Sequence, residues 1–233
     1  MAKLTSLFTY NGTFKDVTNV HSKLYGKHIR AARGTYKPAR INDALKKSGK
    51  LMKVANGFAK AVKDAIEPYR KNINDGSVWF RLVSLFRLQL GKNGTVDLRG
   101  LKGFEFHPRY KLSNFFFKKI ETRVSENGNE LEVTATTICD YQPVDDEKEG
   151  DSYQQTVIVI FYDPEMKAVV VDESAILPLV YKESQTQKAT FLIPDSSTIA
   201  VIALKIDFFK QGKSIDWETK RGMEIVEVVD VAV

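Results

Sequence analysis

The apolar residues of this chain change their spacing once, at about residue 113, and this change constrains the fold more than any other feature. Before it, they recur at alternate steps of four and three, which places them on one face of an α-helix. After it, they recur at every second position, which is typical of a strand with one buried face. A chain of 233 residues can form one sizeable core or two small ones. We therefore predict an α+β protein with helices first and strands second.

A long helix is the clearest element of the first part. The helical spacing runs through nine positions: Ile41, Leu45, Ser48, Met52, Ala55, Ala59, Val62, Ile66 and Tyr69. The helix should begin after the Pro38 region and end or kink near Pro68, because proline lacks a backbone donor and crowds the preceding turn. Gly49 and Gly57 weaken this helix. Two interpretations stay open for them: they are tolerated or mark a bend, or they let a backbone or a phosphate approach closely.

A second helix is predicted after a turn at residues 71–76. Trp79, Val83, Phe86 and Leu90 have helical spacing, and Ser77 is a candidate N-cap. The two segments together predict a helical hairpin over residues 38–90. The apolar residues at the end of the second segment (residues 86–90) also occupy alternate positions, so a strand is an alternative interpretation there.

The second part of the chain reads as a series of short strands. Residues 115–124 and 130–138 flank Asn127-Gly128, which is a strong hairpin signal. Further candidate strands are residues 154–162, 167–181, 189–194, 198–209 and 222–232. This number of strands predicts a C-terminal antiparallel β-sandwich, immunoglobulin-like in size, over residues 113–233. Residues 91–112 read as a connector, and residues 1–37 as a basic extended arm or hairpin.

The charge of the chain is divided between its two parts. Residues 1–90 hold 18 Lys and Arg against 5 Asp and Glu, a difference of +13, and residues 91–233 hold 17 against 24, a difference of −7. Such asymmetry is typical of proteins that bind polyanions or contact copies of themselves head to tail. The sequence leaves both interpretations open.

The basic residues concentrate before and along the long helix, where residues 46–63 hold six lysines and no acid. The candidate residues for binding a polyanion or a partner are Lys27, Arg30, Arg33, Lys37, Arg40, Lys46, Lys50, Lys53 and Lys60. Three interpretations stay open for them: nucleic acid, an acidic protein surface (including this chain's own acidic half), or a solvated face. The sequence has no recognisable nucleic-acid-reading motif, so we expect any nucleic-acid contact to be with backbone phosphates.

No other motif in the sequence indicates a catalytic or metal-binding site. Residues 145–151 space their acids as a calcium loop would, but Thr156 stands where the bidentate glutamate is needed. The three histidines have no metal-ligand spacing, and Cys139, the only cysteine, reads as a buried thiol. We expect no enzymatic activity, no metal and no cofactor. No apolar run is long enough to span a bilayer and no secretory signal is visible, which predicts synthesis in the cytoplasm.

The order of these features resembles a family of uncharacterised proteins from Bacteroidota and their phages and mobile elements. The resemblance rests on YGKHIRAARG (residues 25–34), the helix that begins INDALKKSGK (residues 41–50) and the late strand IAVIALKIDFF (residues 199–209). It departs from the family where Ala39-Arg40 precedes the helix in place of threonine-proline. The resemblance implies a basic helical part and an immunoglobulin-like C-terminal half, and supplies no catalytic residues.

These observations favour a non-enzymatic structural or assembly protein, with a phage virion component as its concrete form. Its partners would be protein subunits, either copies of itself or other structural proteins, and nucleic acid contacted through phosphates. The alternative is a free nucleic-acid-binding module without sequence preference.

Overall fold

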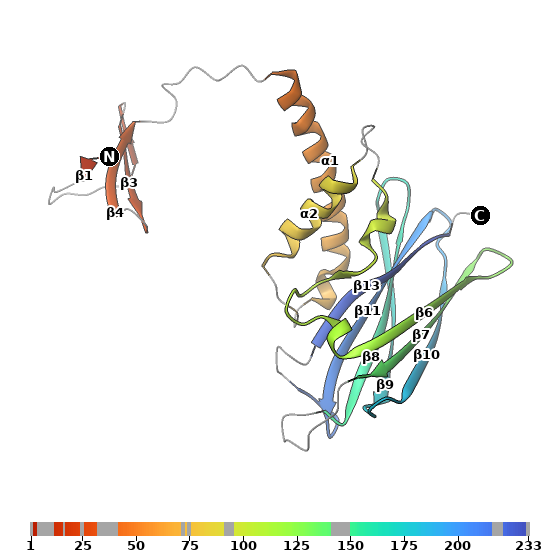
Figure 1. The fold of residues 1–233 in the computed structure, drawn as a ribbon. Coiled ribbons are helices and arrows are strands. Elements are labelled where there is room, and N and C mark those ends of the chain that lie inside the picture. Colours follow the sequence, from red (N-terminus) through yellow and green to blue (C-terminus); the bar gives the residue numbers. More distant parts are fainter. Residues whose placement is uncertain are drawn as a thin grey trace. The chain divides into compact units, whose positions relative to one another are not determined.

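The computed structural model describes residues 2–3, 12–15, 17–23, 26–31, 42–70, 73, 76–90, 96–140, 150–215 and 221–231 (Figure 1). The chain forms two compact units, Met1–Ser48 and Gly49–Val233.

The first unit contains a four-stranded antiparallel sheet in the order β1-β4-β3-β2. Its strands are β1 (Ala2–Lys3), β2 (Gly12–Phe14), β3 (Val17–Ser22) and β4 (Gly26–Ala31). The sequence predicts a basic extended arm or hairpin over residues 1–37, and the described residues of that segment form these four strands, in which β3 and β4 are an antiparallel hairpin and β4 is paired on both sides. The spacing of apolar residues does not predict this sheet, because its strands are at most six residues long and none has apolar residues at every second position.

The second unit contains the remaining strands and most of the helical residues, and α1 begins in the first unit. The helices are α1 (Asp43–Ile66) and α2 (Val78–Gln89), with short 3-10 helices at Glu67–Tyr69, Leu98–Leu101 and Leu112–Asn114. The strands are β5 (Phe104–Glu105), β6 (Phe116–Val124), β7 (Glu130–Cys139), β8 (Ser152–Tyr162), β9 (Ala168–Pro178), β10 (Ser184–Leu192), β11 (Ile199–Lys210), β12 (Lys213–Ser214) and β13 (Arg221–Asp230). The predicted combination of helices with a mostly antiparallel β-rich half is confirmed.

The long helix is confirmed, and so is its end near Pro68. The Asn42 side chain accepts a hydrogen bond from the Leu45 backbone N–H (2.8 Å) and so caps the first turn. At the other end, Pro68 lies in the 3-10 turn that follows α1. The second helix is confirmed as well, although the Ser77 side chain does not cap it and instead accepts a hydrogen bond from Arg81 Nε (3.1 Å).

Two antiparallel sheets make up the β-rich half. One has three strands in the order β10-β7-β6, and the other has the order β5-β13-β11-β8-β9 with β12 paired to β11. The predicted hairpin is the β6–β7 pair, and Gly128 at its turn has a φ of 71°, which favours glycine.

The middle strands of the larger sheet are buried on both faces. On β8, Ile158 and Ile160 belong to one hydrophobic cluster, and Val157 and Val159 belong to another. Since successive side chains of a strand point to opposite faces, the two clusters lie on opposite sides of the sheet. The first cluster contains buried residues of α1 and α2, and the second contains residues of β7 and β10. Helices therefore cover one face, and the three-stranded sheet covers the other (Figure 1).

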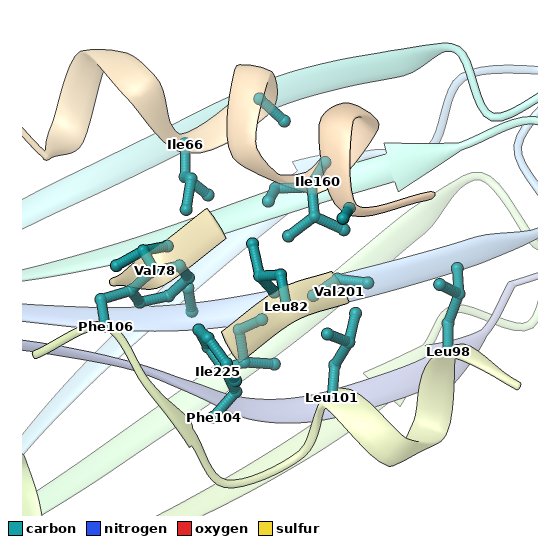
Figure 2. Close-up of a cluster of buried hydrophobic side chains, with 14 of the residues drawn as sticks. Ile66, Val78, Leu82, Leu98, Leu101, Phe104, Phe106, Ile160, Val201 and Ile225 are labelled. Atoms are coloured by element: carbon teal, nitrogen blue, oxygen red, sulfur yellow. The ribbon is translucent and has the colours of Figure 1, made fainter. Parts of the chain in front are cut away.

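The helix-side core also includes residues of the segment that we expected to be only a connector. Leu98 and Leu101 are almost fully buried in it, as are Phe104 and Phe106 (Figure 2). Figure 2 shows these side chains around Leu82 of α2 together with Val201 and Ile225 of the sheet. The described part of the connector, residues 96–112, thus contributes to the core, and two of the glycines that suggested a linker, Gly100 and Gly103, lie between core positions.

The buried face of each helix differs in part from the predicted one. On α1, the predicted positions are buried only from Ala55 onward, and Leu45 is 59% exposed. On α2, the fully buried residues are Val78, Leu82 and Phe86. Trp79, Val83 and Leu90 of the predicted face are only partly buried, and Phe80 is 69% exposed. Because α2 is apolar on most of its surface, its sequence does not define which side faces the core.

A chain of buried polar side chains connects the two sheets. Thr137 Oγ1 lies 2.8 Å from both the Tyr153 hydroxyl and Gln155 Oε1. Gln155 Nε2 donates to Gln187 Oε1 (3.2 Å), and Gln187 Nε2 donates to the Glu173 carbonyl (3.1 Å). Each of these polar groups has a hydrogen-bond partner. The network can therefore fix how the two sheets are aligned without leaving a buried polar group unpaired. Cys139 lies close by and is buried, as predicted.

Leu82→Ala tests whether the helices and the sheets share one core. The Leu82 side chain is fully buried between α2 and the sheet, so we expect the free energy of unfolding to fall by about 2–5 kcal/mol. Leu88→Ala is the matched control, because Leu88 lies on the same helix and is 87% exposed, and it should change the free energy by less than about 0.5 kcal/mol. Chemical denaturation followed by circular dichroism measures both. Equal effects of the two substitutions would contradict the packing.

Candidate polyanion or partner interface

Four of the predicted basic residues form one row on α1, which we call the lysine stripe: Lys46, Lys50, Lys53 and Lys60. Their spacing of four, three and seven places them on one side of a helix, opposite the buried Ala55, Ala59 and Val62. All four are exposed. Fourteen residues separate the ends of the stripe, which corresponds to about 21 Å along the helix axis.

Most of the stripe is not neutralised by acids of the described chain. Lys46 pairs with Asp43 (3.0 Å), but both side chains are largely exposed, so the pair contributes little. No carboxylate of the described residues lies within ion-pair distance of Lys50, Lys53 or Lys60. Three neighbouring cations on one helix face repel one another, and an anionic partner would remove this repulsion.

Gly57 lies on the same side of α1, between Lys53 and Lys60. A Cβ atom added at Gly57 or at Gly49 would meet nothing within 4 Å. Packing within the described residues therefore does not require glycine at either position. The missing side chains leave the helix backbone accessible along the lysine stripe, which suits close approach of a phosphate or of another backbone.

The two predicted basic residues before α1 that the structure describes do not lie on one face. Lys27 and Arg30 are both exposed on β4, but they are three positions apart on a strand and so lie on opposite faces of the sheet. His28 between them is buried. Arg33, Lys37 and Arg40, the other predicted residues of this group, lie outside the described residues.

A groove of about 750 Å³ lies between α2 and residues 102–111, and sequence reasoning missed it. Phe80, Ser84 and Leu88 are spaced four apart and line it from α2, with Leu85 beside them. The exposed fractions of Phe80 and Leu88, 69% and 87%, are unusually large for apolar side chains of this size. The signal that could have identified the groove is a second apolar face on α2, opposite the buried one.

Arg81 fixes one wall of the groove to the other. Its guanidinium donates to the Glu105 carbonyl (2.6 Å) and to the Phe106 carbonyl (2.7 Å), and lies 5.0 Å from the centre of the Phe104 ring. These contacts join α2 to β5, the edge strand of the larger sheet. The groove is thus a rigid feature of the surface, and Lys102 and Lys111 add two cations to its rim.

Glu105 lies where the groove meets the core. Burial raises the pKa of its carboxyl group, and the nearby Lys118 ammonium and the hydrogen bonds from Leu112 N–H (3.2 Å) and the Ser113 hydroxyl (3.4 Å) oppose the shift in pKa. Lys118 itself is bonded to Glu224, and burial lowers its pKa. Two carboxylates therefore share one half-buried lysine at the contact between β5, β6 and β13.

No protein-family model matches the chain, and no curated protein matches it. Within the described ranges, no group of three or more His, Cys, Asp or Glu residues is arranged to hold a metal ion. None of the described helices has both the length and the apolar character that crossing a bilayer requires.

Gly57→Ala should raise the free energy of unfolding by about 0.5–1 kcal/mol, because alanine favours the helix and its methyl group meets open space. Gly222→Ala is the contrasting variant, since its Cβ would lie 2.4 Å from Leu112 Cδ2 and should destabilise the fold. Urea denaturation measures both changes. A loss of stability in Gly57→Ala would mean that the glycine has a structural role in the helix.

Glu105→Gln should remove part of the dependence of stability on pH. A carboxyl group whose pKa is raised by folding stabilises the fold fully below its unfolded pKa, near 4.5, and this stabilisation is lost as pH rises through the folded pKa. Glutamine keeps an acceptor for the Leu112 N–H but carries no charge. We therefore expect the variant to be at least as stable as the wild type at pH 7, with a smaller loss of stability between pH 4 and pH 7. Urea denaturation at several pH values measures the difference, and an unchanged pH profile would contradict the assignment.

Proposed function

We propose that this chain is a non-enzymatic structural protein that assembles with protein subunits, and that the lysine stripe of α1 binds a polyanion. The observation that carries the proposal is the exposed row of Lys50, Lys53 and Lys60, for which no carboxylate of the described chain lies within ion-pair distance. The polyanion is a nucleic-acid backbone or the acidic surface of a neighbouring subunit. A phage virion component is the concrete form of this proposal, in keeping with the resemblance to Bacteroidota phage-associated proteins.

The chemistry of the stripe supports contact with charge rather than with bases. It contains lysines and glycines and no aromatic side chain on which a base could stack. Lysine acts as a point charge, so phosphate contacts would be independent of sequence. Lys27 and Arg30 are on opposite faces of β4, so they would not extend the stripe as one surface.

We further propose that the two sheets form an immunoglobulin-like sandwich. Counting from β6 and leaving out the two-residue β12, the first, second and fifth strands form one sheet and the third, fourth, sixth and seventh form the other. This division is that of immunoglobulin-like folds in which the fourth strand joins the sheet of the third. Such sandwiches serve as subunits in many assemblies, and this task does not need an active site.

The alternative is a free nucleic-acid-binding module, in which the same lysines contact phosphates and the protein does not assemble. The oligomeric state separates the two functions, because only the structural protein should associate as its concentration rises. Light scattering over a range of concentrations measures this.

The lysine stripe is tested by the variant Lys50→Glu/Lys53→Glu. If the stripe binds phosphates, random-sequence DNA should bind the wild type with a steep dependence on salt, and the slope of log affinity against log salt should fall by roughly 0.7–0.9 for each lysine removed. The matched control is Lys188→Glu/Lys213→Glu, which changes the net charge equally at exposed positions on β10 and β12. Fluorescence anisotropy with labelled DNA between 50 and 300 mM salt measures the slopes.

Three outcomes are informative. A loss of DNA binding in the stripe variant alone assigns the stripe to nucleic acid. Equal losses in the stripe variant and in the control would mean that only net charge matters, and would overturn the stripe as a site. Absence of DNA binding by the wild type, even at low salt, leaves the acidic neighbour as the partner of the stripe.

A further inference from the structure

The groove beside α2 is apolar at its centre and basic at its rim. Phe80, Leu85 and Leu88 supply the apolar surface, and Arg81, Lys102 and Lys111 supply the cations. We call these six residues the basic groove. Lys102 pairs with Glu227 (2.6 Å), but its side chain stays 58% exposed, so this pair is weak and leaves the ammonium group accessible to an acidic occupant. The one acidic side chain in the lining, Glu105, accepts hydrogen bonds from Leu112 and Ser113 and so points its charge back toward the protein. An occupant of the basic groove should therefore be apolar with acidic flanks.

The opposite edge of the same sheet has this complementary composition. Asp172 and Glu173 of β9 and Glu183 beyond its end are exposed acids, and Ile176, Val180 and Tyr181 are exposed apolar residues between them. We call these six residues the acidic edge. Asp172 points to the helix side of the sheet, where it accepts a hydrogen bond from the Tyr69 hydroxyl (2.7 Å), and Glu173 points to the other side, so the two acids flank the edge. Ile176 is 69% exposed, which is as much as Phe80 in the groove. Lys182 is the one cation in this stretch, and it lies over the Tyr181 ring (5.1 Å).

The acidic edge is held in place by backbone hydrogen bonds. Leu179 N–H donates to the Asp151 carbonyl (3.0 Å), and Lys182 N–H donates to the Cys139 carbonyl (2.8 Å). The backbone of Tyr181 forms an isolated bridge with Cys139, which attaches this segment to the end of β7. Because the segment is already ordered, binding through it would cost little conformational entropy.

The two surfaces lie at opposite edges of one sheet. The strand order places β5, next to the basic groove, at one edge and β9 at the other. Two copies that met through the same edge would bring Asp172 and Glu173 against each other, or the groove cations against each other, and like charges across a contact are unfavourable. Contact between the two different edges brings acids to bases and apolar surface to apolar surface.

We propose that copies of this chain associate head to tail, with the acidic edge of one copy seated in the basic groove of the next. This contact rests on the proposed assembly function and specifies its surfaces. It is heterologous, so it generates a ring if the rotation between copies closes and a filament if it does not. Arg81 already occupies the outward carbonyls of Glu105 and Phe106, so the contact joins side chains rather than extending the sheet through β5.

Charge-swapped variants of the full chain test the contact. The groove variant is Ser84→Glu/Lys111→Glu, and the edge variant is Glu173→Lys/Glu183→Lys; all four residues are exposed, so both variants should fold as the wild type does. Sedimentation velocity at low salt should show that the wild type associates as its concentration rises. Each variant alone should associate at least about tenfold more weakly, because like charges then face each other. An equimolar mixture of the two variants should regain the association, since an acidic groove then meets a basic edge.

An apolar substitution and its matched control complete the test. Leu88→Ser should weaken the association, whereas Leu192→Ser should not, because Leu192 is also highly exposed (73%) but lies on β10 outside both surfaces. Equal effects of the two substitutions would overturn the role of the groove. Thermal melting of each variant verifies that it is folded.

The possible failures are distinguishable. Association that persists in both the groove variant and the edge variant overturns the head-to-tail contact and leaves the proposed assembly function standing. A mixture that stays dissociated also overturns the contact. A wild type that remains monomeric at every concentration overturns both the contact and the assembly function, while DNA binding by the lysine stripe is measured independently.

Discussion

The structure of the second unit depends on the burial of β8 and β11 on both faces. Val157 and Val159 face the three-stranded sheet, while Ile158 and Ile160 face the helices. Because these strands are apolar at consecutive positions, neither face can be left in water, and a second layer is needed on each side. The helices and the three-stranded sheet are those layers. Each exposed surface with a proposed role lies on the outside of this arrangement.

The same arrangement decides what the basic helix can do. From Ala55 onward, one face of α1 is covered by the core, so its lysines are directed to the other side. Packing thus converts a lysine-rich segment into an exposed row of defined length. The arm residues that looked equivalent in the sequence are not: Lys27 and Arg30 point from opposite faces of β4. Periodicity within each element, rather than total charge, determines which cations can act together.

The second unit separates charge in space rather than along the chain, because Lys102 and Lys111 of the basic groove belong to the acidic half of the sequence. The basic groove and the acidic edge are far apart in sequence and lie at opposite edges of one sheet. Arg81 is central to the first, because it joins α2 to the edge strand and so holds two exposed apolar residues beside the basic rim. A monomer gains nothing from exposing Phe80 and Leu88, whereas a subunit that binds its neighbour does.

The sequence by itself determined the helices, most strands, the β6–β7 turn and the position of the lysine stripe. These features depend on local periodicity and turn chemistry, which a single segment contains. The tertiary structure decided the rest: the short N-terminal sheet, the burial of the connector, and the side of α2 that faces the core. These features depend on pairing between distant segments, and α2 is apolar on nearly every side, so its sequence could not indicate that Leu82 is buried and Leu88 exposed. The second apolar face of α2 is visible in the sequence, but only the folded chain shows that residues 102–111 lie beside it and complete the groove.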